Sequence, residues 1–440
     1  MKKFLLLAII FGFFGRIAYS QDFDKAKLDS YFDVLEANNK FMGSVALSKN
    51  GEIIYSRAIG FADVENKIKA GVDSKFRIGS ISKTFTSVLV MKAVEENRID
   101  LEQTINKYFP TIKNSEKIKI AHLLYHRSGI HNFTNDREYL TWNTVAKSEK
   151  EMVEIIAKGG SDFEPDSKAD YSNSNFVLLT FILEKAFKKS YSEILTKYIT
   201  KPLGLKNTYL GAKINSAENE SLSYRFSGKW ELMPETDISI PLGAGGIVST
   251  PSDLVMFSDA LFSGKLLKPE SLEKMKTVIG NFGIGLVKIP FFDKIGFGHT
   301  GGIDGFSSVF CHFQDGNISY ALTSNGTNFN NNQISLAVLS AIYNKPYEIP
   351  EFKNFNLTSE ELDRYTGVYS SAQIPLKITV TKSNLSLMAQ ATGQSAFPLE
   401  ASGKDIFRFE QAGIVMEFNP TEKKMVLKQG GGQFLFVKDN

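Results

Sequence analysis

The stretch that decides the fold is Phe76-Arg77-Ile78-Gly79-Ser80-Ile81-Ser82-Lys83, which is followed by an apolar run at 84–91. We expect a short extended segment to turn at Gly79 and to enter a helix at Ser80. Residues three apart share one face of a helix, so the Lys83 amine can reach the Ser80 hydroxyl. A desolvated lysine can take the proton of a serine, which is otherwise a weak nucleophile. The helix N-terminus would also stabilise a developing oxyanion.

The spacing of this motif leaves other interpretations open. A second match, Ser271 and Lys274, follows Pro269 in a charged stretch without a preceding glycine turn, which is typical of a solvated helix face. For Ser80 itself, the motif alone is equally compatible with a serine that caps the helix while Lys83 faces solvent. Other segments must therefore decide its role.

The first residues predict export. Residues 1–20 combine a basic start, an apolar run from Phe4 to Phe14 and small residues before Gln21, the pattern of a cleavable signal peptide. An uncleaved membrane anchor is the alternative, although the apolar run is short for a bilayer. We therefore expect a periplasmic or secreted protein.

Charge and cysteine usage narrow the partners. The chain has 51 Lys+Arg and 48 Asp+Glu, and three of the basic residues lie within residues 1–20, so the remainder is formally neutral. A neutral protein carries no electrostatic signature of nucleic-acid or anionic-membrane binding, and we expect a small-molecule or peptide substrate. Cys311 is the only cysteine, which excludes an intrachain disulfide and favours core filling. The sequence does not indicate the oligomeric state.

Periodicity predicts two structural domains. Residues 21–347 read as one α/β domain, an antiparallel sheet flanked by helices with an inserted helical region. An Asn50-Gly51 turn between two apolar runs is typical of a hairpin. A linker at 348–361 precedes alternating apolar residues at 362–440, which predict a small β-barrel, sandwich or lipocalin-like domain without catalytic residues, as a stabilising or oligomerising appendage. The expected helices cover 25–38, 80–96, 119–126, 148–158, 174–187 and 332–343, and the expected later strands cover 280–289, 306–313 and 318–323.

Two further segments carry chemistry. Tyr171-x-Asn173 opens an apolar helical run, and we expect two nearby cationic groups to lower the pKa of Tyr171 so that it shuttles protons. Asn173 can bind both the lysine and a substrate amide, or it can simply cap the helix. The glycine-rich stretch 298–305, which includes His299 and Thr300, suggests backbone that closely approaches a ligand and completes an oxyanion hole; the alternative is a loop with a surface histidine.

The histidines do not predict a metal site. His122 and His126 are four residues apart, but no acid stands between them at the zincin position and no third ligand is evident. We expect both of them, with His131, to pack beneath the site. No metal and no cofactor are predicted.

Taken together, the three motifs resemble those of the serine β-lactamase-related family, which holds class C β-lactamases, D-alanyl-D-alanine carboxypeptidases, D-amino-acid peptidases and β-lactamase-fold esterases. The likeness covers about residues 25–345 and includes the stretches 121–130 and 243–254. The tail resembles the small β-barrel appended to many such proteins. The resemblance implies a β-lactamase/penicillin-binding-protein-like fold and the following roles: Ser80 is acylated, Lys83 and Tyr171 share the general-base role, Asn173, His299, Thr300 and Gly301 bind substrate, and the N–H groups of Ser80 and Gly302 hold the oxyanion.

Two departures from the family pattern affect the expected substrate. His299 stands where typical β-lactamases carry lysine, and a neutral imidazole anchors a substrate carboxylate less well. We therefore expect a hydrolase of small D-amino-acid peptides, amides or esters rather than an efficient β-lactamase. A non-catalytic penicillin-fold binding protein is the alternative from another class. Asp166 stands where glycine is more usual, so the loop before Tyr171 is expected to differ.

Overall fold

The computed structural model describes residues 23–352, 355, 357–383 and 386–439. The signal peptide predicted at 1–20 lies outside the described residues. Within these ranges no helix has both the length and the apolar character needed to cross a membrane.

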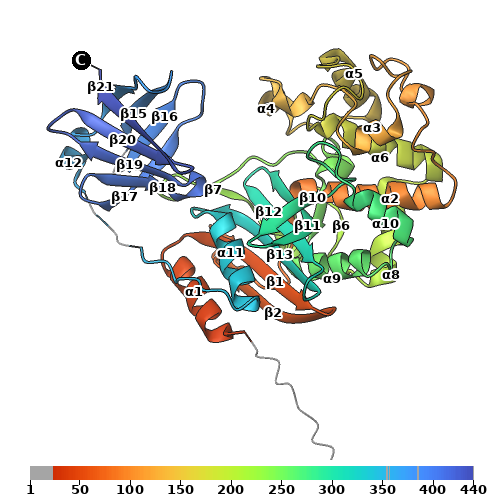
Figure 1. Ribbon diagram of the computed structural model, residues 1–440, viewed down its shortest axis with the longest axis horizontal. Coiled ribbons are helices and arrows are strands. Elements are labelled where there is room, and N and C mark those ends of the chain that lie inside the picture. Colours follow the sequence, from red (N-terminus) through yellow and green to blue (C-terminus); the bar gives the residue numbers. More distant parts are fainter. Residues whose placement is uncertain (1–22, 353–354, 356, 384–385, 440) are drawn as a thin grey trace, which may run out of the picture.

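A six-stranded antiparallel sheet forms the centre of the larger domain, in the order β10-β11-β12-β13-β1-β2 (Figure 1). The early strand β1 therefore pairs with β13, which follows the other strands of this sheet in the chain, and β2 lies at the edge. The predicted hairpin is confirmed: Asn50 and Gly51 connect β1 to β2 with φ angles of 56° and 82°. The strands are β1 (Phe41–Lys49), β2 (Glu52–Ile59), β10 (Val287–Phe291), β11 (Lys294–Ile303), β12 (Phe306–Phe313) and β13 (Ile318–Thr327).

Helices cover both faces of this sheet. On one face, α1 (Lys25–Ala37) and α11 (Asn331–Ile342) pack side by side, and α1 buries the apolar positions that its periodicity predicts. On the other face, α9 (Pro251–Phe262) lies across β1, β12 and β13. The arrangement confirms the predicted antiparallel sheet between helical layers.

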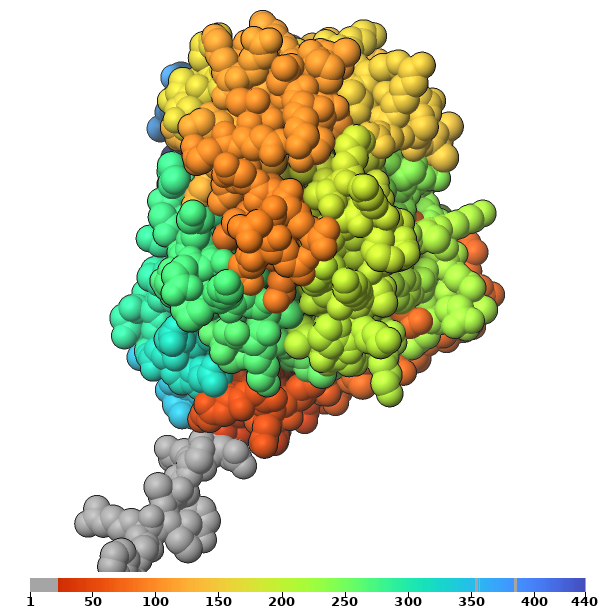
Figure 2. Space-filling model, turned by 90° about the vertical axis from the view of Figure 1, so that its right-hand side faces the viewer, coloured from red at the N-terminus to blue at the C-terminus, as the bar shows by residue number. Residues whose placement is uncertain are grey.

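The inserted helical region packs beside the sheet and contributes to the largest apolar core. In Figure 2 its orange and yellow residues form the upper part of the visible face, above green segments of the sheet domain. The start of one helix differs from the expected position. Helix α2 was expected to begin at Ser80, but it begins at Ser82, after a tight 3₁₀ turn at Gly79–Ile81. The helices are α2 (Ser82–Glu95), α3 (Ile120–Leu124), α4 (Tyr139–Trp142), α5 (Glu149–Gly159), α6 (Asn173–Phe187), α7 (Tyr191–Leu195) and α8 (Lys201–Leu203).

Short elements complete the domain. Strands β5, β9 and β6 form a small sheet that leads into the Ser80 turn. The bounds are β3 (Phe61–Asp63), β4 (Ile68–Lys69), β5 (Phe76–Arg77), β6 (Tyr209–Leu210), β7 (Tyr224–Phe226), β8 (Trp230–Leu232), β9 (Ile247–Ser249) and α10 (Pro269–Lys276).

The strand predicted at 280–289 is largely wrong. Only its end, from Val287 onward, is extended. Gly280 and Gly285 have φ angles of 67° and 63°, which a regular strand does not allow. The Thr84 hydroxyl donates to the Gly285 carbonyl at 2.7 Å, so this segment packs as a turn against α2. The glycines that break the strand permit this close approach.

The C-terminal strands close into an antiparallel barrel, as predicted. Its apolar core is separate from the two cores of the larger domain. The limits 21–347, 348–361 and 362–440 stay predictions. The elements are α12 (Ser359–Asp363), β14 (Gly367–Ser370), β15 (Lys377–Ser383), β16 (Ser386–Ala391), β17 (Phe397–Gly403), β18 (Ile406–Phe409), β19 (Ile414–Asn419), β20 (Lys424–Gln429) and β21 (Gly432–Lys438).

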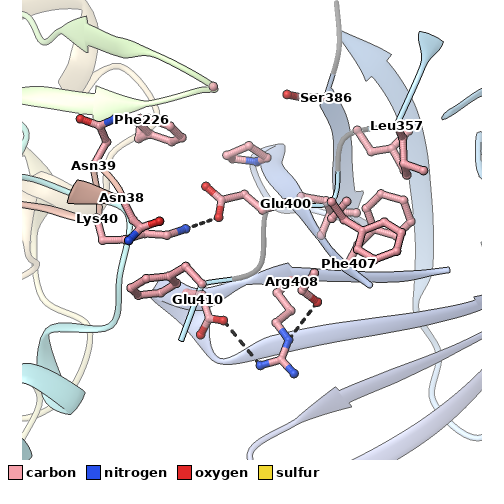
Figure 3. A pocket seen from close by; sticks show the side chains of 18 of the residues that line it. Asn38, Asn39, Lys40, Phe226, Leu357, Ser386, Glu400, Phe407, Arg408 and Glu410 are labelled. Carbon is pink, nitrogen blue, oxygen red and sulfur yellow. Dashed lines mark hydrogen bonds and ion pairs between the residues drawn. The ribbon is translucent and has the colours of Figure 1, made fainter. Parts of the chain in front are cut away.

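A cavity of about 630 Å³ lies where the barrel meets the sheet domain (Figure 3). Lys40, just before β1, pairs there with Glu400 of β17. The Asn328 side chain donates to the same carboxylate. The contact therefore joins the barrel to the end of the sheet where strand β1 begins and strand β13 ends.

Candidate active site

Ser80 lies in the tight turn between β5 and α2. Gly79 has a φ of +50°, and a Cβ added there would come within 2.6 Å of the Gly302 nitrogen. The turn is thus packed directly against the end of β11. Ser80 and Gly302, whose N–H groups are the predicted oxyanion donors, line the same two cavities.

Lys83 is completely buried one turn further along. Its Nζ lies 3.0 Å from Ser80 Oγ, 2.7 Å from Asn173 Oδ1 and 2.6 Å from the Ala244 carbonyl oxygen. Burial holds the pKa of Lys83 well below its ordinary value. A neutral amine has two N–H donors and one lone pair. Its two N–H groups donate to the side-chain oxygen of Asn173 and to the carbonyl oxygen of Ala244. The lone pair is then left for the Ser80 hydroxyl.

Tyr171 approaches the same oxygen from the segment before α6. Its hydroxyl donates to Ser80 Oγ at 2.8 Å. The expectation of a lowered pKa is wrong: burial raises the pKa of Tyr171 to about 12, and the hydrogen bond with Ser80 offsets this only in part. The cost of desolvating a phenolate dominates in this buried position. Tyr171 is therefore a phenol at neutral pH.

Asn173 is the first residue of α6, while Ser172 occupies the capping position. The side-chain oxygen of Asn173 accepts a hydrogen bond from Lys83, and its Nδ2 donates one to Thr134 Oγ1 at 3.0 Å. Sequence analysis missed both Thr134 and the Ala244 carbonyl. Nothing in the sequence around Thr134 signals its role, whereas Ala244 belongs to the noted stretch 243–254.

His299 is buried on β11, so the alternative of a surface loop is wrong. Its Nδ1 lies 2.6 Å from the Thr300 carbonyl oxygen, which requires a proton on Nδ1. Burial, and secondarily the nearby Lys83, lowers the pKa of His299 to about 4. The imidazole is therefore neutral at physiological pH.

Most of the glycines of β11 are packed closely against other parts of the protein and leave no room for a ligand. A Cβ at Gly298 would lie 1.9 Å from the Phe310 carbonyl oxygen, and one at Gly301 would lie 2.0 Å from that of Ile78. At Gly302 the nearest atom is 3.9 Å away, so this position alone of the three is open. The expected backbone approach to a ligand is thus restricted to Gly302.

Two cavities flank Ser80 and Gly302. Their volumes are about 390 and 280 Å³. Among the described residues that line them there is no lysine or arginine, and the one carboxylate, Asp304, is paired with Arg77. The larger cavity is bounded by Phe133, Thr134, Tyr139, Leu140, Asn143, Asn173, Met233, Pro234, Thr236, Pro241, Ala244, Gly245, Ile303 and Asp304; the smaller by Tyr171, Phe282, Val287, His299, Thr300 and Gly301.

His122, His126 and His131 line neither of the two cavities. His126 is buried against Tyr171, whereas His122 caps the N–H of Lys119 and His131 pairs with Asp162 near the surface. No group of three or more potential metal ligands occurs among the residues that the structure describes. Asp166 has a φ of 68°, the left-handed conformation that glycine adopts readily, and pairs with Arg127.

Residues 32–344 match the protein family described as Beta-lactamase. The chain belongs to the Beta-lactamase family. This Beta-lactamase-family chain is 25% identical over 443 residues to a penicillin-binding protein of Bacillus subtilis (strain 168), covering 92% of this chain and 97% of that protein. It is 30% identical over 253 residues to the teichoic acid D-alanine hydrolase of Staphylococcus aureus (strain MRSA252), covering 57% of this chain and 61% of that protein, less than two thirds of its length.

Solved structures show the same fold. The D-amino acid amidase from Ochrobactrum anthropi SV3 complexed with L-phenylalanine amide is 26% identical, with a TM-score of 0.64 over 73% of this chain and 99% of that one. The octameric penicillin-binding protein homologue from Pyrococcus abyssi is 22% identical, with a TM-score of 0.65 over 94% and 100% of the two chains. The Beta-lactamase-family chain is accordingly an enzyme, a serine hydrolase.

Proposed function

We propose that the protein is an exported hydrolase that forms an acyl-enzyme at Ser80 and cleaves small amides or esters of D-amino-acid type. One observation carries the proposal: Ser80 Oγ lies between the buried amine of Lys83 and the phenol of Tyr171, beside a neutral His299. This arrangement provides a nucleophile with its base and proton carrier. It provides no cation for a substrate carboxylate.

In the proposed reaction Lys83 is the general base. Its lone pair takes the Ser80 proton as Oγ attacks the substrate carbonyl carbon, and the N–H groups of Ser80 and Gly302 hold the resulting oxyanion. Tyr171 donates its proton to the leaving nitrogen or oxygen when the bond to the acyl carbon breaks, and recovers a proton from Lys83. Water then attacks the acyl-enzyme and gives up a proton to Lys83, and the protonated Lys83 returns that proton to Ser80 Oγ as the bond to the acyl carbon breaks, which releases the acid and restores Ser80.

The substrate class follows from charge. β-Lactams and peptides ending in D-alanine present a carboxylate near the scissile bond, and the described residues that line the cavities include no lysine or arginine to receive it. Similar proteins include a D-amino acid amidase and a teichoic acid D-alanine hydrolase, whose names specify amide and D-alanine substrates. Both likenesses support amides and esters ahead of β-lactams.

Turnover by the mature protein tests the proposal. The panel is p-nitrophenyl acetate, D-alanine p-nitroanilide and nitrocefin, with Ser80→Ala as the blank. Ser271→Ala is the matched control, since Ser271 and Lys274 repeat the motif on α10, away from the cavities. We expect turnover that Ser80→Ala abolishes and Ser271→Ala leaves unchanged, with nitrocefin the poorest substrate. Activity that survives Ser80→Ala would overturn the acyl-enzyme, and nitrocefin as the best substrate would favour a β-lactamase.

A further inference from the structure

His126 adopts an unusual conformation beneath the site. It follows α3, is 3% exposed and has a φ of 55°. A left-handed backbone costs a residue other than glycine about 1–2 kcal/mol. His126 lines neither cavity, so contact with substrate does not account for it. Its contacts with neighbouring protein groups must explain why the fold holds it there.

The first set of contacts fixes the backbone around Tyr171. The His126 carbonyl oxygen accepts the N–H of Asp170 at 2.8 Å. Its Nδ1 accepts the N–H of Ser172 at 3.1 Å. One residue thus holds the backbone N–H groups of the residues before and after Tyr171. The second bond fixes the peptide between Tyr171 and Ser172, the residue that precedes Asn173.

The second set of contacts fixes the plane of the phenol. The imidazole stacks on the Tyr171 ring with centroids 4.5 Å apart and an interplanar angle of 30°. Phe282 packs edge-on against the imidazole at 4.8 Å, and Phe176 lies at 5.3 Å. The Tyr171 ring therefore rests on a platform that is itself held from two other directions.

The ring is neutral in this position. The titratable groups that face it are Lys83 on α2, Tyr171 before α6 and His299 on β11, and no carboxylate is among the described contacts. Burial, followed by the proximity of the basic groups Lys83 and His299, holds the pKa of His126 well below its ordinary value. A neutral imidazole with a bare Nδ1 is the form that accepts the Ser172 N–H.

We propose that His126 is a positioning residue that aims the Tyr171 hydroxyl and Asn173 at Ser80 and Lys83. This role rests on the proposed function, because it acts through Tyr171. His126 itself exchanges no proton with substrate. A shift of about 1 Å in a catalytic group can cost about 100-fold in rate, so loss of this support should lower kcat more than it raises KM.

Two variants separate the two contacts. His126→Asn tolerates the positive φ and keeps an acceptor near Ser172, but removes the stacked ring. His126→Phe keeps a flat ring and removes the acceptor. His122→Asn, on the preceding helix α3, is the matched control, because the described contact of His122 is with the N–H of Lys119 and not with Tyr171. With D-alanine p-nitroanilide we expect kcat to fall about 10- to 100-fold in both His126 variants, with KM within about threefold, and no change in His122→Asn.

A double-mutant cycle tests whether His126 affects catalysis through the Tyr171 hydroxyl. If His126 acts through the Tyr171 hydroxyl, adding His126→Asn to Tyr171→Phe should lower kcat by less than about twofold, because coupled effects are not additive. An unchanged kcat in both folded His126 variants would overturn the proposal. An equal loss with and without the Tyr171 hydroxyl would also overturn it, since it would indicate general destabilisation.

A second readout does not require turnover. In protein with ¹³Cζ-labelled tyrosine, the Tyr171 signal is assigned by its absence from Tyr171→Phe. We expect it to titrate well above the ordinary tyrosine range in the wild type and lower in His126→Asn, where water reaches the phenol. The same titration in both proteins would overturn the proposal. Absence of Ser80-dependent turnover would overturn the proposed function separately.

Discussion

Arg77 donates to Asp304 at 3.2 Å in an ion pair whose side chains are only 1% and 3% exposed. The pair joins β5, which leads into Ser80, to the turn that follows Gly302 on β11. Arg77 also donates to the carbonyl oxygens of Thr236 and Ala212 at 2.7 and 2.9 Å. It thereby holds both proposed oxyanion donors and one wall of the larger cavity in place.

Arg77→Met should lower the free energy of unfolding by about 3–5 kcal/mol, because it leaves Asp304 buried without its partner. Urea denaturation measures the change. The control is Arg225→Met, which breaks the pair between Arg225 and Glu231, whose side chains are 67% and 37% exposed; we expect a far smaller loss of stability, because solvent screens an exposed pair. Equal losses in the two variants would contradict the structural role of the buried pair.

Gly79→Ala should abolish most activity. The new methyl group would collide with backbone atoms of Gly302 at 2.6–2.9 Å and push β11 away from Ser80. Gly51→Ala is the control, because Gly51 also has a positive φ, +82°, but has no atom within 4 Å of an added Cβ. Both carry a left-handed backbone cost of about 1–2 kcal/mol, whereas only Gly79→Ala should lose p-nitrophenyl acetate turnover. Normal turnover by a folded Gly79→Ala protein would refute the close packing.

Tyr171→Phe should lower kcat by about 10²–10⁴-fold with little change in KM, since it removes a proton carrier and keeps the ring. Steady-state kinetics on the amide substrate measures both constants. Tyr320→Phe controls for loss of a buried hydroxyl, because Tyr320 contacts Ser335 in the other apolar core. We expect the control to keep full activity; comparable activity losses in both variants would argue against a specific role for Tyr171.

Activity should fall as the pH falls. The proposed base is the neutral amine of Lys83, which exists above its pKa, and burial holds that pKa well below the ordinary value of 10.5. Activity is therefore lost as the pH drops through the lowered pKa of Lys83. The phenol of Tyr171, with a pKa of about 12, stays protonated until strongly alkaline pH. A pH profile of kcat/KM tests this; a rate that rises on acidification would exclude a neutral lysine base.

Features that depend on neighbouring residues could be predicted from the sequence. The Asn50-Gly51 hairpin and the buried face of α1 follow from local turn chemistry and periodicity. The contact between Ser80 and Lys83 follows from their spacing. The order of the motifs indicated the family, which the match over residues 32–344 confirms.

Features that depend on residues far apart in the chain could not be predicted from the sequence. The Ala244 carbonyl meets Lys83 across 161 positions, and no local pattern encodes that contact. The pKa of Tyr171 was misjudged because it depends on how deeply the fold buries the ring. The segment 280–286 was wrongly predicted to be a strand because the sequence does not show that it packs against α2.

The pairing of β1 with β13 has a consequence for synthesis. Phe41 lies opposite Thr327, so β1, an interior strand of the sheet, lacks one of its two neighbours until nearly three hundred further residues have left the ribosome. Such distant pairing slows folding and leaves strand edges exposed in the meantime. The barrel strands pair in chain order apart from the closing contact of β14 with β21, so we expect the barrel to fold faster. The growing chain therefore depends more on protection from aggregation while the first domain is made than while the second is.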